Sequence, residues 1–249
     1  MSNHPLAGKV AVICGGSGGI GAASAGLLAA AGATVVVGYH SNAGKAEAVV
    51  AGLTGTGHLA LPAPMTDSAA LGRLAATVGD RFGRADMLVN SAGMTKPVAH
   101  KEFDGLTDEL IDEVFKVNWR GPFAAVRAFR QLLAAGDDGL IVNISSIAAT
   151  TGIGSSIAYC GAKAGLDIMS VALARALAPE IRVLVVSPGV VDTEFVAGRT
   201  AEANAKIAAG TPLKRVASTD EVARAVLACA THLTFSTGSI IQVDGGRHL

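Results

Sequence analysis

The stretch Cys14–Gly21, C-G-G-S-G-G-I-G, begins at the last residue of the apolar run Lys9–Cys14. It precedes the small-residue run A-A-S-A-G-L-L-A-A-A-G-A. It fits G-x-G-x-x-G (Gly16, Gly18, Gly21) and also G-x3-G-x-G (Gly15, Gly19, Gly21). Glycines between a strand and a helix allow a tight turn, let backbone N–H groups approach a phosphate and let the helix pack closely on the sheet. A glycine pattern alone also suits a purely structural turn, but its place in a strand-turn-helix unit predicts dinucleotide binding.

Short runs rich in Val, Ile and Leu alternate with helical patterns along the rest of the chain. The predicted strands are Lys9–Cys14, Thr34–Tyr39, His58–Leu61, Asp86–Asn90, Gly139–Ser145, Arg182–Ser187 and Ser239–Val243. The predicted helices begin near Gly19, Lys45, Ser68, Thr107, Ile157 and Thr219. Several strands are apolar throughout, as in a parallel sheet covered on both faces. The alternation predicts an α/β fold with a Rossmann-type, doubly wound, parallel seven-stranded sheet in three α/β/α layers.

No linker, repeat or low-complexity tract divides the chain, so residues 1–249 are expected to form a single dinucleotide-binding domain. Gly121-Pro122, inside the helical segment Thr107–Leu133, is expected to break or kink that helix. The longest stretch without a strand pattern is Pro188–Ala217, which is interpreted as a mobile lid or substrate loop at about residues 188–217.

The composition excludes several classes of protein. Lys plus Arg and Asp plus Glu are 20 each, so the formal net charge is zero and neither a nucleic-acid-binding surface nor a polybasic membrane anchor is expected. The amino terminus lacks an apolar signal region, and no apolar run approaches the roughly 20 residues of a membrane-spanning helix. Cys14, Cys160 and Cys229 are widely spaced and the histidines form no ligand motif, so we expect reduced thiols in a cytoplasmic protein and no metal site.

The end of the second predicted strand reads V-V-V-G-Y-H-S-N. An NAD site carries Asp or Glu at this place to bind the ribose 2′-hydroxyl, whereas this chain has Tyr39, then His40 and Ser41. No carboxylate would repel a 2′-phosphate, and His40, Ser41 and Lys45 are candidates to hold one, although no arginine is present to clamp it. The pattern favours NADP(H), with NAD(H) as the alternative.

The stretch Y-C-G-A-K, Tyr159–Lys163, holds one of only two tyrosines in the chain. Positions i and i+4 share a helical face, so the phenol and the ammonium can lie side by side. A nearby cation favours the phenolate and makes a tyrosine usable as a proton donor or acceptor near neutral pH. In isolation the two residues would more simply be a surface pair.

These motifs occur in a set order with N-S-A-G (Asn90–Gly93), Asn118, Ser146 and S-P-G-V-V-D-T (Ser187–Thr193). Taken together they resemble the short-chain dehydrogenase/reductase family, and the resemblance runs from about Leu6 to Gly246. Within that family, the length, the G-I-G start and the segment G-Y-H-S-N-A-G-K are most similar to 3-oxoacyl-[acyl-carrier-protein] reductases.

The resemblance implies roles for four residues. Tyr159 would be the general acid in carbonyl reduction and the base in alcohol oxidation. Lys163 would hold the nicotinamide ribose and assist Tyr159, and Ser146 would hydrogen-bond the substrate oxygen. Ser146 is favoured over Ser145 because of its spacing of thirteen residues to Tyr159. Asn118 would support a water that relays protons to Lys163.

Cofactor contacts are expected from the glycine turn, the end of the second strand and the family motifs. They are Gly15, Ser17, Gly18, Gly19, Ile20, Gly21, Tyr39, His40, Ser41, Met65, Asn90, Ala92, Gly93, Tyr159, Lys163, Pro188, Gly189, Val191 and Thr193.

Three positions depart from the family pattern. Cys14 stands where Thr is usual, and Pro64 occupies a position that is commonly Asp or Asn, so adenine recognition would rely on the backbone near Met65. Gly18 takes the place where many NADP(H)-dependent members carry a basic residue, which counts against the cofactor prediction.

The predicted function is that of an NADP(H)-dependent carbonyl reductase/alcohol dehydrogenase acting on a 3-oxoacyl thioester. A dehydrogenase of a small ketone, sugar or cyclic alcohol is the alternative. A non-catalytic redox sensor is a third reading, against which the intact set Asn118, Ser146, Tyr159 and Lys163 argues. The resemblance also implies a homotetramer assembled through the helices around residues 107–133 and 157–177.

Two features have both a functional and an ordinary interpretation. Arg127 and Arg130 share a helical face that could receive an acidic carrier protein or a coenzyme A phosphate, or they are solvated charges. Phe195 either closes over the substrate or only anchors its loop.

Overall fold

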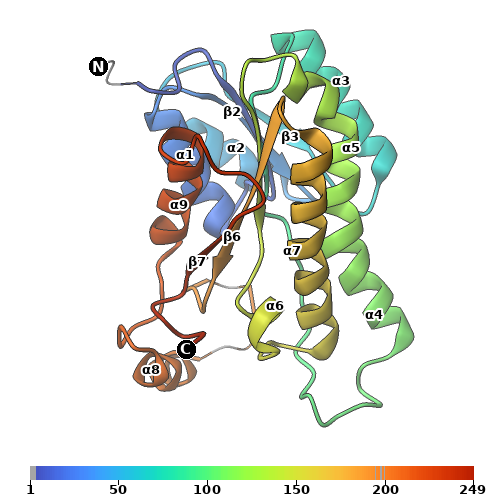
Figure 1. Cartoon of the computed structure of the whole chain (residues 1–249), viewed down its shortest axis with the longest axis vertical. Coiled ribbons are helices and arrows are strands. Elements are labelled where there is room, and N and C mark those ends of the chain that lie inside the picture. The colour runs from blue at the N-terminus through green and yellow to red at the C-terminus, as the bar shows by residue number, and fades with distance from the viewer. Residues whose placement is uncertain (1–3, 194, 197, 199) are drawn as a thin grey trace.

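One parallel sheet of seven strands forms the centre of the molecule, in the order β3-β2-β1-β4-β5-β6-β7 (Figure 1). The computed structural model describes residues 4–193, 195, 196, 198 and 200–249. From β1 the chain moves outward to β2 and β3, then returns to pair β4 on the other side of β1. This order confirms the doubly wound Rossmann-type sheet. The strands are β1 (Val10–Cys14), β2 (Thr34–Tyr39), β3 (Leu59–Pro62), β4 (Met87–Asn90), β5 (Gly139–Ile144), β6 (Ile181–Pro188) and β7 (Ile240–Val243).

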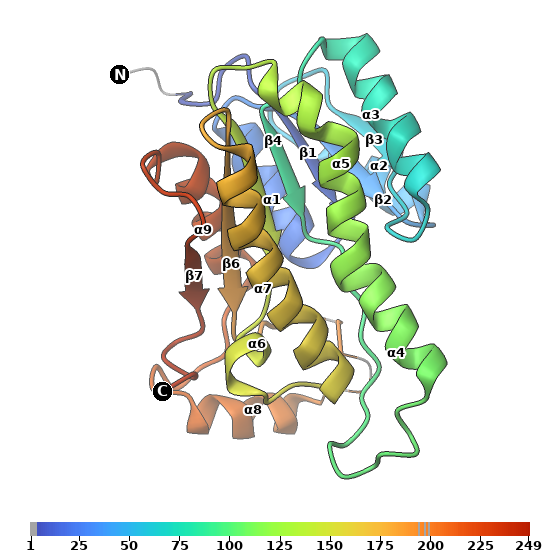
Figure 2. The same ribbon diagram turned by 45° about the vertical axis from the view of Figure 1, so that its right-hand side comes forward.

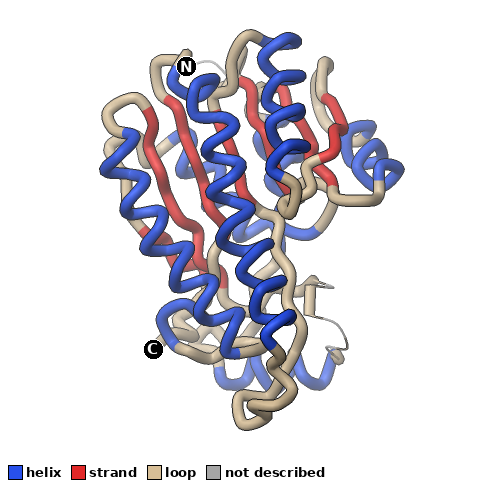
Figure 3. Tube along the Cα trace, turned by 90° about the vertical axis from the view of Figure 1, so that its right-hand side faces the viewer, coloured by secondary structure: helices blue, strands red, loops and turns tan. Residues whose placement is uncertain are grey.

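Helices cover both faces of the sheet and complete the three layers (Figures 1 and 3). One face packs against α1 (Gly19–Ala30), α2 (Ala43–Ala51) and α9 (Thr219–Thr231). The other packs against α3 (Ser68–Phe82), α5 (Gly121–Ala134) and α7 (Ile157–Leu177). In Figure 2, α4 (Asp108–Phe115) extends α5 beyond the carboxyl ends of the strands.

The central strands are apolar throughout because both of their faces are covered. In β1, Ala11 and Ile13 belong to the core on the α1 side, whereas Val12 and Cys14 belong to the core on the α5 side. Successive side chains point to opposite faces of a strand, so both sets are buried completely. Burying a side chain the size of Ile13 stabilises the fold by roughly 1.5–3 kcal/mol.

The sequence predicted a break or kink at Gly121-Pro122, but the helical run continues through this pair. It widens one turn earlier into a π-helical turn, η1 (Lys116–Arg120), in which the Gly121 N–H donates to the Lys116 carbonyl oxygen. Pro122 then falls in the first turn of α5, where a missing N–H is tolerated. A Cβ on Gly121 would lie 2.7 Å from Met65 Cβ, so glycine permits this close packing.

The segment 188–217 is not a loop throughout. Its described part contains α8 (Ala201–Gly210), whose first turn is capped by the Thr200 hydroxyl accepting from the Ala203 N–H at 3.2 Å. A parallel bridge between Val191 and Ala217 brings the two ends of the segment together. The sequence prediction missed α8, and also the short helix α6 (Ala148–Thr151).

Helix α7 is, by length and composition, apolar enough to cross a membrane, which contradicts the expectation that no run in the chain approaches that length. Half of its apolar window is buried inside the fold, where the helix packs on β6. A buried core helix passes the same test, so the length of α7 carries no argument for a membrane.

Candidate active site

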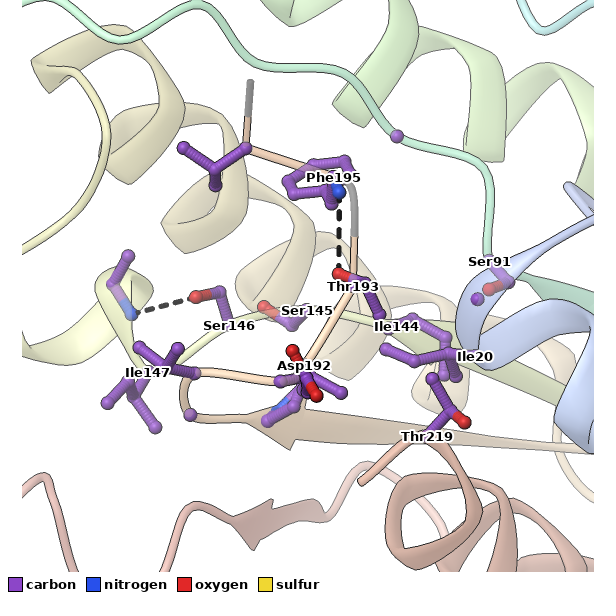
Figure 4. Close-up of a pocket in the computed structure, with 18 of the residues that line it drawn as sticks. Ile20, Ser91, Ile144, Ser145, Ser146, Ile147, Asp192, Thr193, Phe195 and Thr219 are labelled. Carbon is purple, nitrogen blue, oxygen red and sulfur yellow. Dashed lines mark hydrogen bonds between the residues drawn. The ribbon is translucent and has the colours of Figure 1, made fainter. Parts of the chain in front are cut away.

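A cavity of about 1100 Å³ opens at the carboxyl ends of the strands, where ligands bind in doubly wound sheets (Figure 4). It brings together residues predicted from motifs far apart in the sequence. Those that line it are Gly18, Gly19, Ile20, Gly93, Ser146, Tyr159, Lys163, Pro188, Gly189, Val191 and Thr193.

The glycine turn forms one wall of the cavity. Gly15 has a φ of +80°, and a Cβ there would lie 2.5 Å from the Ala92 backbone nitrogen. A Cβ on Gly21 would collide with the Gly15 carbonyl oxygen, whereas one on Gly19 would meet only the Thr193 methyl group at 3.7 Å. The turn is therefore tightly packed against the protein at Gly15 and Gly21 and open to the cavity at Gly19. No side chain caps the amino terminus of α1, which follows the turn. This cradle fits the pyrophosphate of a dinucleotide.

Tyr159 and Lys163 enter the cavity from the first turns of α7, which the Ser156 hydroxyl caps by accepting from the Tyr159 N–H at 3.2 Å. Both side chains are buried, and Lys163 Nζ lies 5.7 Å from the centroid of the Tyr159 ring. Nζ donates to the Ile144 carbonyl oxygen at 2.8 Å. Burial lowers the pKa of Lys163 to about 8, and the charge of Asp167 opposes that shift. The ammonium thus titrates near physiological pH.

Ser146 follows the end of β5 and points into the same cavity (Figure 4). Its Oγ accepts a hydrogen bond from the Ala148 N–H at 3.2 Å, which fixes the oxygen and leaves its own hydrogen to be donated. The hydroxyl is therefore suited to donate to an oxygen of a bound molecule.

Asn118 is buried in η1 and does not line the cavity. Its Nδ2 donates to the carbonyl oxygens of Met94 at 2.8 Å and Val114 at 2.9 Å, and its Oδ1 accepts from the Met94 N–H at 3.4 Å. These bonds tie the π-helical turn to the segment behind Gly93. Wide π-turns of this kind often occur at functional sites.

A chain of buried amides and hydroxyls lies beneath the cavity and joins three elements. Asn90 Nδ2 donates to Asn143 Oδ1 at 2.8 Å, and Asn143 Nδ2 donates to Ser170 Oγ at 2.8 Å. Ser170 Oγ donates in turn to the Leu166 carbonyl oxygen at 2.7 Å. Asn90 thus braces β4 against β5 and α7, below the place where it was predicted to meet the cofactor.

Several predicted cofactor contacts lie outside the cavity lining. Tyr39 is half-buried at the end of β2, His40 and Ser41 are exposed beyond it, and Met65 is buried against Gly121. Gly15, Ser17, Gly21 and Ala92 lie around and beneath the glycine turn. Lys45, considered only secondarily from the sequence, does line the cavity, and a Cβ on Gly18 would lie 3.1 Å from its Nζ.

The cavity also contains residues that the sequence did not single out or left undecided. The Phe195 ring lies 6.0 Å from the Tyr159 ring at an angle of 52°, and the Phe195 N–H donates to Thr193 Oγ1 at 3.4 Å (Figure 4). Arg247, just after the D-G-G motif, donates to the Ile207 carbonyl oxygen of α8 at 3.3 Å. Only the folded chain brings this carboxyl-terminal arginine to the substrate segment.

Burial raises the pKa of Cys14 to about 12 and that of Cys229 to about 11. Among the described residues, no group of three His, Cys, Asp or Glu side chains could hold a metal ion.

Comparison with known proteins identifies relatives over nearly the whole chain. The family described as "Enoyl-(Acyl carrier protein) reductase" matches residues 15–248. The chain is 38% identical to cis-4-hydroxycyclohexanecarboxylate dehydrogenase of Sinomonas cyclohexanicum, with 97% of each covered. It is 32% identical to 3-oxoacyl-[acyl-carrier-protein] reductase of Escherichia coli, with 97% of this chain and 98% of the relative covered. The crystal structure of a short-chain dehydrogenase/reductase titled glucose/ribitol dehydrogenase, from Brucella melitensis, superposes with a TM-score of 0.91 at 29% identity over the full length of both chains.

Proposed function

We propose that this chain, which belongs to the short-chain dehydrogenase/reductase family of oxidoreductases acting on alcohol and keto groups, is an NADP(H)-dependent carbonyl reductase/alcohol dehydrogenase. Residues 1–249 would act as one NAD(P)-binding domain, with 188–217 as the substrate segment. The observation that carries the proposal is that Ser146, Tyr159 and Lys163 share one cavity with the open glycine turn.

The protein would position the substrate and the cofactor and would supply a proton. A bound nicotinamide dinucleotide supplies or accepts the hydride. Tyr159 Oη would give its proton to the substrate oxygen as the carbonyl becomes an alcohol, and would take it back in the reverse direction. Ser146 Oγ would donate a hydrogen bond to the same oxygen, and the Lys163 ammonium would favour loss of the Tyr159 proton. Asn118 would hold the backbone behind Gly93 in place.

Lys45 supports a preference for NADP(H). Its Nζ lies beside Gly18, the position where many NADP(H)-dependent relatives carry a basic side chain, so α2 would provide the cation that the glycine turn lacks. At the end of β2, the positions Tyr39, His40 and Ser41 carry no carboxylate that would repel a 2′-phosphate.

Lys45→Met tests this assignment. We expect the KM for NADPH to rise about tenfold and that for NADH to stay the same, since one exposed charge-assisted contact to phosphate is lost. The exposed Lys101→Met serves as the matched control. A wild-type preference for NADH, or equal effects of Lys45→Met on both cofactors, would contradict the assignment.

A 3-oxoacyl thioester is the first candidate substrate. The similarity to the Escherichia coli 3-oxoacyl-[acyl-carrier-protein] reductase supports it, as do Arg127 and Arg130, both exposed on α5, where an acidic carrier could bind. The decisive measurement is the initial rate of cofactor oxidation with an acetoacetyl thioester, with NADPH and NADH in parallel. No turnover with either cofactor would exclude this substrate and leave the second candidate.

A cyclic hydroxy acid is the second candidate, supported by the relative named cis-4-hydroxycyclohexanecarboxylate dehydrogenase and by Arg247. Arg247 lines the cavity and takes part in none of the ion pairs of the described residues, so its guanidinium could receive a substrate carboxylate. We expect 4-oxocyclohexanecarboxylate to be reduced faster than cyclohexanone, and Arg247→Met to abolish the difference. Equal rates for the two ketones in the wild type would exclude this candidate.

Assembly as a cytoplasmic homotetramer is also proposed. Large apolar side chains are exposed on α4, η1, α5 and α7, where relatives of this family are expected to pair; they are Phe115, Trp119, Phe123 and Ile168. The balanced net charge gives no support for a nucleic-acid partner or a membrane partner. Light scattering on the wild type and Ile168→Glu tests the assembly, and a monomeric wild type would contradict it.

A further inference from the structure

Asp167 is a buried acid with no evident structural partner. It lies on α7 one helical turn beyond Lys163 and on the same inward face, and it is only 5% exposed. Both carboxylate oxygens are buried, and neither has a hydrogen-bond partner of normal geometry among the described residues.

An acid buried in this way destabilises the fold unless a nearby group compensates its charge. Asp244, which is also buried, shows the usual arrangement: it accepts from the Gly246 N–H at 3.0 Å, the His248 N–H at 2.8 Å and His248 Nδ1 at 2.7 Å. Asp167 has no such set of donors, so a structural role does not account for its carboxylate.

Lys163 is the charged group that acts on Asp167. Burial raises the pKa of Asp167, while the Ser145 hydroxyl and the Lys163 charge lower it. In return, the Asp167 charge opposes the lowering of the Lys163 pKa by burial. Ser145 and Lys163 both line the cavity that Tyr159 enters, whereas Asp167 does not line it.

The other ionisable groups on α7 and on the elements packed against it do not shift the pKa of Asp167. Helix α6 has none, and Arg182 on β6 binds Asp138. The remainder are Asp108, Glu109, Asp112 and Glu113 on α4, Lys116 and Arg120 on η1, and Tyr159, Cys160 and Arg175 on α7 itself.

We propose that Asp167 is a positioning residue whose carboxylate is the counter-ion of the buried Lys163 ammonium and keeps that lysine charged while it acts on Tyr159. The proposal rests on the proposed function for the role of Lys163, but the charge state itself is measurable without a substrate. Asp167 acts through Lys163 and touches neither substrate nor cofactor.

The test is the titration of Lys163 in the full-length protein. Lysine labelled with ¹³C at the ε carbon is followed by NMR from pH 6 to pH 11, and Lys163→Met identifies the signal. We expect Asp167→Asn to lower the midpoint by about one pH unit, because an adjacent anion is lost. Asp167→Glu should restore the wild-type midpoint, and Ser170→Ala, a buried polar change one turn further along α7, should leave it unchanged. A midpoint that is the same in Asp167→Asn and the wild type would overturn the proposal.

A second measurement needs no variant at position 167 and covers the case in which Asp167→Asn does not fold. In the wild type, protonation of Asp167 at acid pH should produce a second inflection in the Lys163 ε-carbon shift, and its absence would overturn the proposal. With a working ketone substrate, the alkaline limb of kcat should move to lower pH in Asp167→Asn by the same amount as the NMR midpoint. If no ketone is reduced, the proposed function fails while the titration still decides the charge state.

Discussion

Two buried aspartates mark opposite edges of the sheet, and their surroundings differ completely. At the amino ends of the strands, Asp86 accepts from the Val10 N–H at 2.8 Å, from Lys9 Nζ at 3.1 Å and from Arg84 Nε at 3.2 Å. At the carboxyl ends, the oxygens of Asp167 have no hydrogen-bond partner among the described residues. The two side chains are about equally inaccessible, so burial does not explain the contrast.

The comparison suggests two different roles for a buried carboxylate: Asp86 stabilises the fold, whereas Asp167 acts on the charge of a site residue. A carboxylate that accepts from three residues fixes the chain segments that supply these donors, here the starts of β1 and β4. An acid left without donors beside a lysine of depressed pKa weakens the fold locally, and the cost is tolerated at a functional edge. Substitutions at the two edges should therefore affect different observables.

The largest effect is expected for a substitution at the carboxyl ends of the strands, and it should change catalysis but not stability. Tyr159→Phe should lower kcat by about a thousandfold, equivalent to about 4 kcal/mol, because the proton donor is lost. Cofactor affinity, measured by fluorescence titration, and the melting temperature should stay close to wild type. Near-normal turnover would contradict the assignment of Tyr159 as the acid.

The next largest effect is expected at the amino edge and only on stability. Asp86→Ala should reduce the free energy of unfolding by about 2–3 kcal/mol, since the Val10 N–H is left buried and two cations lose their partner. Lys9 and Arg84 are one-third exposed, so water relieves part of the cost. Urea denaturation measures the loss, while kcat per folded molecule should not change. If Asp86→Ala lowered kcat without lowering the free energy of unfolding, Asp86 would not have the purely structural role proposed for it.

Lys163 should make stability depend on pH in the alkaline range. Its folded-state pKa of about 8 lies below the ordinary 10.5, so the unfolded chain binds more protons between these values and the lysine's contribution to stability rises with pH there. From pH 7.5 to pH 9 the wild type should gain about 1 kcal/mol relative to Lys163→Met. The buried thiols, whose pKa values are raised, oppose this trend above pH 9 in both proteins and cancel in the comparison. Urea denaturation of both proteins at the two pH values measures this gain. If the free energy of unfolding of the wild type relative to Lys163→Met were the same at pH 7.5 and pH 9, the lowered pKa of Lys163 would be contradicted.

The smallest effect is expected for Asp167→Asn on stability at pH 7. Because the folded-state pKa of Asp167 is raised, ionisation of this group destabilises the fold increasingly as pH rises above its ordinary value near 3.8. Removing the charge should leave the free energy of unfolding unchanged or raise it by up to about 1 kcal/mol, the opposite sign to Asp86→Ala. A loss of 2 kcal/mol or more, as at Asp86, would show that the two carboxylates are equivalent.

The sequence predicts the sheet and the main site motifs because both depend on local patterns. Apolar strands and a strand-turn-helix glycine pattern are visible in short windows, and β1 to β7 lie within a residue or two of their predicted positions. The pair Tyr159 and Lys163 was visible because helical spacing alone places the two side chains on one face.

The residues that the sequence missed, or named only as secondary candidates as it did Lys45, depend on distant contacts. Lys45 meets Gly18 only once α2 has folded against the turn, and Arg247 reaches the cavity from the end of the chain. Asp167 reads as an ordinary polar residue of a helix until its face is known to be the buried one. The helix α8 was missed because its Ala-rich run has no buried residue and thus no apolar stripe to mark it.

The wide turn η1 sets how α4 is rotated about the helix axis relative to α5. Each residue of an α-helix turns the chain by about 100°, so a π-turn behaves as one extra residue that rotates everything before it relative to α5. Deleting a single residue within Lys116–Arg120 would restore regular helical geometry, yet it would turn Asn118 away from Met94 or Phe115 away from Gly161. In this segment, the length of the sequence is as much constrained as the identity of its residues.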